Sequence, residues 1–377
     1  MKHIITFNND IKKYPPIISN VNTLCELGEE VVILGYCSDN EIINGWIVNG
    51  VRYIEVLKDD TLSNSIVKFF RLFLYKHRVK KAIKNHYSYN ETIVWVFNTR
   101  NVWLLHKVVK KYKAIVYLFE MPEFNVSIRF RLLSPALNYF KTMTSAWKVV
   151  CCEYNRAALT KSYFQLENMP YIIQNKPSVN IDSIPSLKSV DRELYELMKN
   201  KKIILYQGIF NHPERKLDGL CESVDYLPDD YIVMLMGGEG IYRERLIKKY
   251  ESKRVVFVNF KSFPEHLSVT MNAYIGYLSY HSKSSDLYQS LNTLYCAPNK
   301  VFEYSLCGLP IVSNDLPAMR NIFSKYKFGT VTESCSPKAI ADSVLKISDN
   351  YIEYNSSCDE FFNSFDLKYA IKQLIKE

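Results

Sequence analysis

The sequence predicts an α/β protein made of two Rossmann-like, doubly wound domains. Short β-branched runs alternate with helical patterns along the whole chain, which is typical of βαβ units and a parallel sheet. The chain has 377 residues, too many for one ordinary core. The strand series is also interrupted once, by a segment rich in Pro, Ser and Asn. Ligands of such domains bind at the carboxyl ends of the strands, so the loops after the strands are where a site is expected.

The first series of strands is expected at "HIITF" (3–7), "VVILGY" (31–36), "IVWVF" (93–97), "AIVYLF" (114–119) and "KVVCC" (148–152). A helix is expected around 17–28, with Gly28 as its stop. The loops after the strands carry polar residues. Among them, Glu120 and Glu123 are candidates to contact an acceptor or a reacting centre, and they equally fit acids at the start of a helix.

The domain boundaries follow from the interruption of the series. Residues 1–175 form the expected N-terminal domain, and 176–200 the linker. Residues 201–355 form the expected C-terminal domain. We expect 356–377 to be a helix that can pack back on the N-terminal domain.

The second series of strands is expected at "KIILYQG" (202–208), "YIVMLMGG" (231–238), "RVVFVNF" (254–260), "AYIGYLSY" (273–280) and "LPIVSND" (309–315). Gly208 ends the first of these, and Arg215 and Lys216 follow near an expected helix start at about 217. Cations beside a helix N-terminus are typical of a phosphate site, although a solvated loop has the same composition.

Two later loops of this series also hold candidates. Gly238 and Glu239 lie in "GGEG", a turn where the backbone can approach a ligand. Phe263 lies in "KSFPEHLS", where a flat ring can stack, although an ordinary loop hydrophobe fits as well.

The stretch "APNKVFEYSLCGLPIVSND" (297–315) is the most specific pattern in the chain. Pro298 predicts a helix start, Asn299 can cap that helix, and Lys300 can hold a phosphate or a sugar hydroxyl. We expect Glu303 in the first turn, where a carboxylate either favours the helix dipole or accepts hydrogen bonds from a ribose diol. Gly308 then ends the helix.

Composition excludes several classes of protein. Nine cysteines are scattered without a CxxC pair, which favours reduced thiols in a cytosolic protein over a disulfide frame or a zinc site. No run approaches the roughly 18 apolar residues of a membrane span. The net charge of +9 is uneven: residues 1–175 hold 23 Lys and Arg against 14 Asp and Glu, whereas residues 176–377 hold 25 of each. The two halves are therefore expected to do different work.

The segment 61–90 is basic and amphipathic. It contains seven Lys or Arg residues and no acid, with apolar residues such as Phe69, Phe70 and Phe73 at helical spacing. Such a segment fits a helix that lies on an anionic membrane surface. It fits equally well a helix that packs on the domain sheet with a solvated basic face. Binding to nucleic acid is not expected, because no RNA or DNA module is recognisable.

The second half of the chain resembles the C-terminal domain of GT-B glycosyltransferases of the retaining, group 1 or family 4 type. The resemblance covers most of 200–345 and is carried by "YQGIFNHPERKLDGL", "MGGEG", "VNFKSFPEHLSVTMNAYIGYLSY" and, above all, "APNKVFEYSLCGLPIVSNDLPAM". It implies two domains that face each other across a cleft, a nucleotide-sugar donor and retention of anomeric configuration.

The resemblance also implies roles for single residues. Arg215 and Lys216 resemble the diphosphate-binding cations, and Phe263 the residue beside the nucleobase. Glu303 resembles the second Glu of the family's E-x7-E motif, which contacts the ribose. The first Glu of that motif is replaced by Tyr295, so Asn299 and Lys300 are expected to take its role beside the sugar, with Glu120 as a further catalytic candidate.

The resulting hypothesis is a metal-independent glycosyltransferase without a cofactor. The chain lacks the Asp-x-Asp triplet that would suggest a divalent ion. It would transfer a sugar from a UDP- or GDP-sugar to a lipid-linked or polysaccharide acceptor in bacterial surface-polysaccharide assembly, such as that of capsule or lipopolysaccharide. Its expected location is the cytoplasm, with peripheral attachment to the inner face of the cell membrane. The alternatives are a nucleotide-sugar 2-epimerase of the same fold and a non-catalytic scaffold subunit, which the tyrosine at 295 leaves open.

Overall fold

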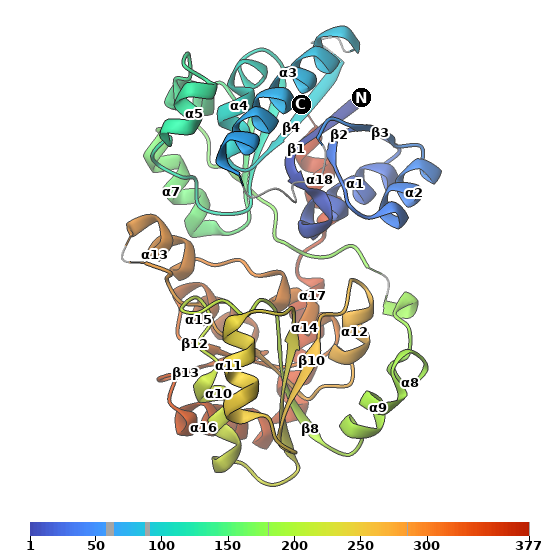
Figure 1. Cartoon of the computed structure of the whole chain (residues 1–377), viewed down its shortest axis with the longest axis vertical. Coiled ribbons are helices and arrows are strands. Elements are labelled where there is room, and N and C mark those ends of the chain that lie inside the picture. The colour runs from blue at the N-terminus through green and yellow to red at the C-terminus, as the bar shows by residue number, and fades with distance from the viewer. Residues whose placement is uncertain (58–63, 87–90, 180, 285, 377) are drawn as a thin grey trace. The chain divides into compact units, whose positions relative to one another are not determined.

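The computed structural model describes residues 1–57, 64–86, 91–179, 181–284 and 286–376, and it divides the chain into two compact units (Figure 1). Unit 1 comprises Met1–Ser178 and Asp366–Glu377, and unit 2 comprises Val179–Phe365. The C-terminal residues therefore return to the unit in which the chain begins.

Unit 1 is built on a seven-stranded parallel sheet with the strand order β3-β2-β1-β4-β5-β6-β7. Its strands are β1 (Lys2–Asp10), β2 (Glu30–Tyr36), β3 (Arg52–Glu55), β4 (Thr92–Phe97), β5 (Lys113–Leu118), β6 (Lys148–Cys151) and β7 (Tyr171–Ile172). Its α-helices are α1 (Pro15–Glu26), α2 (Asn40–Val48), α3 (Ser65–His86), α4 (Thr99–Val109), α5 (Ile128–Leu133), α6 (Tyr139–Thr144), α7 (Tyr154–Phe164) and α18 (Leu367–Ile375). The strand order reverses beside β1, which creates a switch point between β1 and β4.

The central strands of unit 1 are apolar throughout because helices cover both of their faces. All six residues of β4 are buried, as expected for a strand in the middle of a parallel sheet. The helix predicted around 17–28 is α1, which starts with two prolines and is followed by Gly28 at φ +75°. Glycine adopts this left-handed conformation without the steric cost that a Cβ would bring.

The end of the chain packs on unit 1. Ile371 and Leu374 of α18 are fully buried, and the Lys148 ammonium donates hydrogen bonds to the backbone carbonyls of Leu374 and Lys376. The segment 356–377, expected as one helix, is divided in the structure. Its first part ends α17 (Tyr351–Asn363) in unit 2, and its second part is α18 in unit 1.

Unit 2 repeats the plan with six parallel strands in the order β10-β9-β8-β11-β12-β13. Its strands are β8 (Lys202–Gln207), β9 (Tyr231–Gly237), β10 (Val255–Asn259), β11 (Ile275–Leu278), β12 (Ile311–Asn314) and β13 (Gly329–Thr332). Its α-helices are α8 (Leu187–Val190), α9 (Arg192–Met198), α10 (Asp218–Glu222), α11 (Ile241–Tyr250), α12 (Glu265–Thr270), α13 (Leu287–Leu294), α14 (Asn299–Leu306), α15 (Pro317–Tyr326), α16 (Pro337–Asp349) and α17. The switch point of this sheet lies between β8 and β11.

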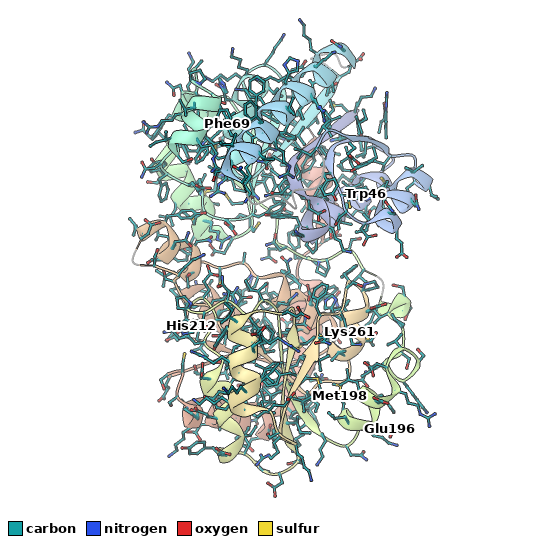
Figure 2. The ribbon with its side chains drawn as sticks, in the orientation of Figure 1. Trp46, Phe69, Glu196, Met198, His212 and Lys261 are labelled. Carbon is teal, nitrogen blue, oxygen red and sulfur yellow. The ribbon has the colours of Figure 1, made fainter. Side chains whose placement is uncertain are left out.

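The segment expected as a linker, 176–200, contains helical structure. Both α8 and α9 belong to unit 2, where Leu187, Leu194 and Met198 join its hydrophobic core. Met198 is 3% exposed, whereas Glu196 on the same helix faces solvent (Figure 2).

The fold prediction is confirmed: each of the ten expected strands coincides with a strand of one of two parallel sheets. Three further strands, β3, β7 and β13, were not expected, and all three lie at the edge of a sheet. None of the described helices combines the length and the apolar character needed to cross a bilayer.

Candidate functional site

The carboxyl ends of β8 and β11 in unit 2 define where a ligand is expected, because they flank the switch point of the sheet. The first polar side chain at this place is Gln207, the last residue of β8. The helix α14 also begins here, after the loop that follows β11 and α13. The predicted donor-side residues come from this edge of the sheet.

The helix α14 starts as predicted but orients its polar residues differently. Pro298 occupies the N-cap position and Asn299 is the first helical residue, so the expectation that Asn299 caps the helix is wrong. Glu303 is the fifth residue of α14 and lies beyond the first turn, so the expectation of a first-turn acid is also wrong. Its position is therefore not explained by the helix dipole, whose effect is confined to the first turn.

Glu303 is a buried carboxylate in a polar cluster. It is 4% exposed, and Val301 and Phe302 beside it are buried as well. Its Oε2 accepts hydrogen bonds from the Lys300 ammonium at 2.9 Å, from the Gln207 amide at 2.8 Å and from the His266 ring at 3.0 Å. Its Oε1 accepts a hydrogen bond from Lys300 at 3.2 Å. A carboxylate has about four lone-pair sites, so Oε1 keeps acceptor capacity for a hydroxyl group.

The cluster keeps Glu303 charged. Burial by itself raises the pKa of this carboxyl, but the positive charge of Lys300 and the hydrogen bonds from His266 and Lys300 outweigh burial and lower the pKa to about 2. At neutral pH the site therefore presents a fixed carboxylate next to the Lys300 side chain.

Two members of this cluster, Gln207 and His266, were not singled out from the sequence. The hydroxyl of Thr270 donates to the Gln207 carbonyl oxygen at 2.7 Å, which turns the amide group of Gln207 toward Glu303. His266 lies in α12, and its Nε2 must carry a proton to donate to a carboxylate. The sequence offered a signal for each of them. Gln207 is a polar residue at the end of a buried strand, and His266 lies in the stretch "KSFPEHLS", which also holds Phe263.

Phe263 lies beside this cluster. Its side chain is 46% exposed, and its ring centroid is 5.8 Å from that of His266. The structure therefore brings an exposed aromatic ring next to the histidine that contacts Glu303, an arrangement on which a flat ligand can stack.

The predicted cations follow β8. The Arg215 guanidinium lies 4.2 Å from the ring centroid of Tyr280 and donates to the carbonyl of Glu214. Lys216 is exposed and forms no salt bridge with any residue that the structure describes. Its backbone N–H donates to Ser279 in the loop after β11. The charges of Arg215 and Glu303 both influence the pKa of the Tyr280 hydroxyl, which burial raises above its usual value.

The glycine-rich turns let these loops approach one another closely. A Cβ on Gly237 would lie 2.1 Å from the carbonyl oxygen of Gly208 and 2.7 Å from the ring of Phe210. Only glycine permits this contact between the ends of β8 and β9. Gly238 and the exposed Glu239 follow in the loop before α11 and do not contact the Glu303 cluster through any hydrogen bond between described residues.

A cavity of 440 Å³ lies further along the same edge, at the carboxyl ends of β11, β12 and β13. Its lining includes Tyr280, His281, Asn314, Glu333 and Cys335. It adjoins the Arg215 side chain through Tyr280, and its wall is mostly apolar with polar groups interspersed, such as the amide of Asn314 and the carboxyl group of Glu333. Tyr295, the residue in place of the expected acid, ends α13 as its C-cap.

The carboxyl edge of unit 1 holds the remaining candidates. Glu120 is exposed and follows β5, and Glu123 accepts a hydrogen bond from Arg100 at 2.7 Å. The next helix, α5, begins only at Ile128, so these acids do not start a helix. The hydroxyl of the half-buried Tyr14 has a raised pKa, because burial and the negative charge of Glu120 both disfavour its ionised form. Asn98, at the end of β4, adopts φ +65°, a conformation that costs free energy for a residue with a Cβ and is concentrated at functional sites.

Comparison with known proteins adds information at the level of the fold. No family model matches the chain, and no curated protein matches it in sequence. Solved structures do match. HepE of Anabaena, crystallised with UDP and glucose, superposes with a TM-score of 0.68 at 11% identity over 99% of this chain and 98% of that one.

Two further solved structures broaden the comparison. WaaG, a glycosyltransferase involved in lipopolysaccharide biosynthesis, superposes with a TM-score of 0.63 at 13% identity over 99% of this chain and 98% of that one. A Listeria monocytogenes protein assigned as a UDP-N-acetylglucosamine 2-epimerase gives a TM-score of 0.60 at 12% identity over 100% and 94% of the two chains. The chain therefore has the two-domain GT-B fold, which transferases and epimerases that use nucleotide sugars share.

Proposed function

We propose that this protein is a glycosyltransferase that takes a sugar from a UDP- or GDP-sugar and transfers it, with retention of configuration, to a lipid-linked or polysaccharide acceptor in bacterial surface-polysaccharide assembly. The observation that carries this proposal is the Glu303 cluster at the switch point of unit 2. A buried carboxylate with a spare acceptor, an exposed ring at Phe263 and two cations at Arg215 and Lys216 supply what a ribose, a base and a diphosphate each require.

In this proposal each donor group has a partner in unit 2. Glu303 Oε1 accepts from a ribose hydroxyl, and Phe263 stacks on the base. Arg215, Lys216 and the backbone turns at Gly208 and Gly238 hold the diphosphate. The cations would stabilise the negative charge that grows on the diphosphate as it leaves, which is electrostatic stabilisation of a developing anion. Lys300 and Asn299 face the sugar, Glu239 lies beside the phosphates, and Glu120 of unit 1 acts on the acceptor side. No divalent metal is needed for this chemistry.

Binding of a nucleoside diphosphate is the direct test. A thermal-shift panel of UDP, GDP and their sugars should reveal one ligand that stabilises the protein, by about 2.7 kcal/mol at a hundredfold excess over its dissociation constant. In the same panel, Lys248→Ala/Lys253→Ala should be stabilised by the same ligand as the wild type. This variant removes two exposed cations of unit 2 at the opposite edge of the sheet, so it controls for a general loss of positive charge. Failure of every nucleotide to stabilise the wild-type protein would overturn the proposal.

A nucleotide-sugar 2-epimerase is the second candidate. The contact between His266 and Glu303 favours it, because it adds a histidine beside an acid at the donor edge, and the Listeria structure has the same fold. Turnover separates the two functions: an epimerase converts the donor without an acceptor, whereas a transferase releases nucleoside diphosphate only when an acceptor is present. A scaffold subunit would do neither.

We further propose that α3 docks on an anionic membrane surface on the cytoplasmic side. Residues 61–63 and 87–90 of the predicted segment lie outside the described residues. Within α3, Tyr75, Val79 and Ile83 are buried against the core of unit 1. A second apolar stripe points to solvent and consists of Ile66, Val67, Phe70, Phe73 and Leu74, which are 39–65% exposed.

The composition of α3 supports a membrane surface as the partner of this face. The helix carries seven cations and no acid, so charge complementarity favours an anionic surface over a neutral one, and the exposed apolar stripe can be buried in a bilayer. Phe70→Ser/Phe73→Ser should release the protein from vesicles of phosphatidylserine in phosphatidylcholine at low salt. The control Ile47→Ser/Val48→Ser removes two exposed apolar side chains from α2 and should leave binding unchanged. Equal losses in both variants would contradict docking through α3.

A further inference from the structure

A group of lysines gathers where α3 and α4 of unit 1 pack together. Lys76 and Lys80 lie one turn apart on α3, and Lys107 lies in the last turn of α4. His106, next to Lys107, is 2% exposed, and its Nδ1 is buried without a hydrogen-bond partner among the described residues. Residues four apart on a helix have Cβ atoms about 5 to 6 Å apart, so the two α3 ammonium groups can reach one ligand.

These lysines have no acidic partner among the residues that the structure describes. The Lys76 ammonium donates to the backbone carbonyl of Leu133 and to the Ser134 hydroxyl, which holds it in place and leaves one of its three donors unused. Lys80 is partly buried. Neither Lys76, Lys80 nor Lys107 forms a salt bridge with any residue that the structure describes.

Burial and the repulsion between these positive charges lower the pKa values of Lys80 and His106. Burial, together with the charges of Lys76 and Lys107, lowers the pKa of Lys80 to about 8. Burial and the neighbouring lysines likewise lower the pKa of His106 to about 4, so it stays neutral. The helix dipole favours a cation at the end of α4, which accounts for Lys107, but it does not favour Lys76 and Lys80 in the interior of α3. Binding of an anion would offset the repulsion between these like charges, which have no acidic partner among the described residues.

The cluster is separate from the candidate acceptor site. The helix α4 begins at the carboxyl end of β4 and carries Lys107 in its last turn, near the opposite edge of the sheet. The helix α3 runs in the same sense as α4 relative to the strands, and Lys76 and Lys80 lie in its second half. The exposed apolar stripe occupies the first half of α3. One helix thus carries an apolar half followed by a cationic half.

We propose that Lys76, Lys80 and Lys107 form a binding site for the exposed phosphate group of a membrane lipid, which the protein engages when the apolar stripe of α3 docks on the bilayer. The proposal rests on the membrane docking proposed above and adds a specific headgroup chemistry to it. A phosphate monoester accepts charge-assisted hydrogen bonds from several ammonium groups at once, whereas the phosphodiester of phosphatidylserine is less charged and is shielded by its serine.

Vesicles of matched surface potential test the site. Wild-type protein should bind vesicles that contain phosphatidic acid about tenfold more tightly than vesicles that contain phosphatidylserine, the effect of roughly one charge-assisted hydrogen bond. Lys80→Gln/Lys107→Gln should abolish this preference. The matched control Lys81→Gln/Lys84→Gln removes two exposed cations from the same helix and should weaken binding to both vesicles equally. Lys76 is left intact because it also supports the fold.

The outcomes separate this site from the other proposals. The site is overturned if the wild-type protein binds both kinds of vesicle with equal affinity, or if the two double variants lose the same amount of affinity. In either case diffuse positive charge explains the binding, and docking through α3 still stands. Absence of binding to either vesicle would overturn docking and site together. If inorganic phosphate raises the pKa of Lys80 but vesicles show no preference, the site takes soluble phosphate and the lipid assignment is wrong. UDP binding, measured on the same samples, should be equal in all variants and reports on unit 2 independently.

Discussion

The carboxyl edges of the two sheets are built differently although the sheets share one plan. In unit 2, Glu303 is buried and receives hydrogen bonds from Lys300, Gln207 and His266. In unit 1, the corresponding edge is lined by aromatic rings. Phe7 lies 4.5 Å from Tyr14 and Phe97 lies 5.4 Å from Phe119, measured between ring centroids, while Glu120 is exposed.

This difference fits the proposal that the two units bind different parts of the reactants. A buried carboxylate that is held by three side chains and keeps one acceptor position is rigid, so it suits a ligand part that never changes, such as a ribose. In unit 1 the rings of Phe7, Phe97 and Phe119 are buried in the core, and the exposed Glu120 is the candidate at this edge that a ligand can reach. The net charge also differs between the two halves of the chain: it is +9 in residues 1–175 and zero in residues 176–377.

The largest expected effect concerns the phosphate cations of unit 2. Arg215→Ala/Lys216→Ala should weaken UDP binding by roughly a hundredfold or more, because two charge-assisted hydrogen bonds of about 1.5–3 kcal/mol each are lost. Binding of uridine, which has no phosphate, should change little. Titration calorimetry of both ligands decides the matter, with Lys248→Ala/Lys253→Ala as the control. Equal losses for UDP and uridine would show that this loop does not touch phosphate.

The next effect concerns the carboxylate itself. Glu303→Ala should weaken UDP binding roughly ten- to a hundredfold and remove most transfer activity, since it removes a charged hydrogen-bond partner. Glu244→Ala on the exposed face of α11 is the matched control. A Glu303 variant that binds and turns over like the wild type would contradict the ribose assignment.

The acid sensitivity of unit 1 is a third, smaller effect. The pKa of His106 is about 4 in the folded protein and near 6.5 when unfolded, so the unfolded state takes up the proton first. Its contribution to stability is therefore complete above pH 6.5 and is lost as the pH falls toward 4, by about 2 kcal/mol between pH 6.5 and 5.

Tryptophan fluorescence can follow this effect in unit 1 alone, because all four tryptophans lie there. His106→Gln should flatten the dependence of the unfolding free energy on pH, whereas His77→Gln, at an exposed position on α3, should not. Identical pH profiles for the wild type and His106→Gln would mean that this histidine is not held neutral.

Removal of divalent metal ions is expected to have no effect on the protein's activity. Treatment with EDTA should leave donor binding and transfer unchanged, because Arg215, Lys216 and Lys300 supply the positive charge that a divalent ion would otherwise bring. Apo protein that recovers activity only on addition of Mg²⁺ or Mn²⁺ would refute the metal-independent mechanism.

Much of the fold could be predicted from the sequence because central parallel strands are apolar on both faces. The run "IVWVF" lies within β4, and "YIVMLMG" coincides with β9, which is buried at every position. The strands β3, β7 and β13 escaped prediction because edge strands are short and only partly buried, so they lack a continuous apolar run. The helix α8 escaped because Pro and Ser dominate the pattern around it, and α9 escaped because it is only seven residues long and follows this stretch directly.

The candidate site could be predicted only as far as local sequence reaches. The motif around Pro298 predicted the start of α14 and brought Lys300 and Glu303 to notice. The partners that bury Glu303 are distant in sequence: His266 lies 37 residues away and Gln207 lies 96 residues away. Only the folded sheet brings β8, α12 and α14 together, so the difference between a first-turn acid and a buried cluster could not be read from the motif.

Hydrogen exchange of the backbone amides in the presence of UDP tests the central claim most directly, because it maps where the nucleotide binds. With UDP at a hundredfold excess over its dissociation constant, protection should rise in the loops at 207–216, 237–240, 260–266 and 298–304 of unit 2, and the carboxyl-edge loops of unit 1 should not change. Protection that appears only in unit 1, or at no place in the carboxyl edge of unit 2, would contradict the assignment of Glu303 and its neighbours as a nucleotide site.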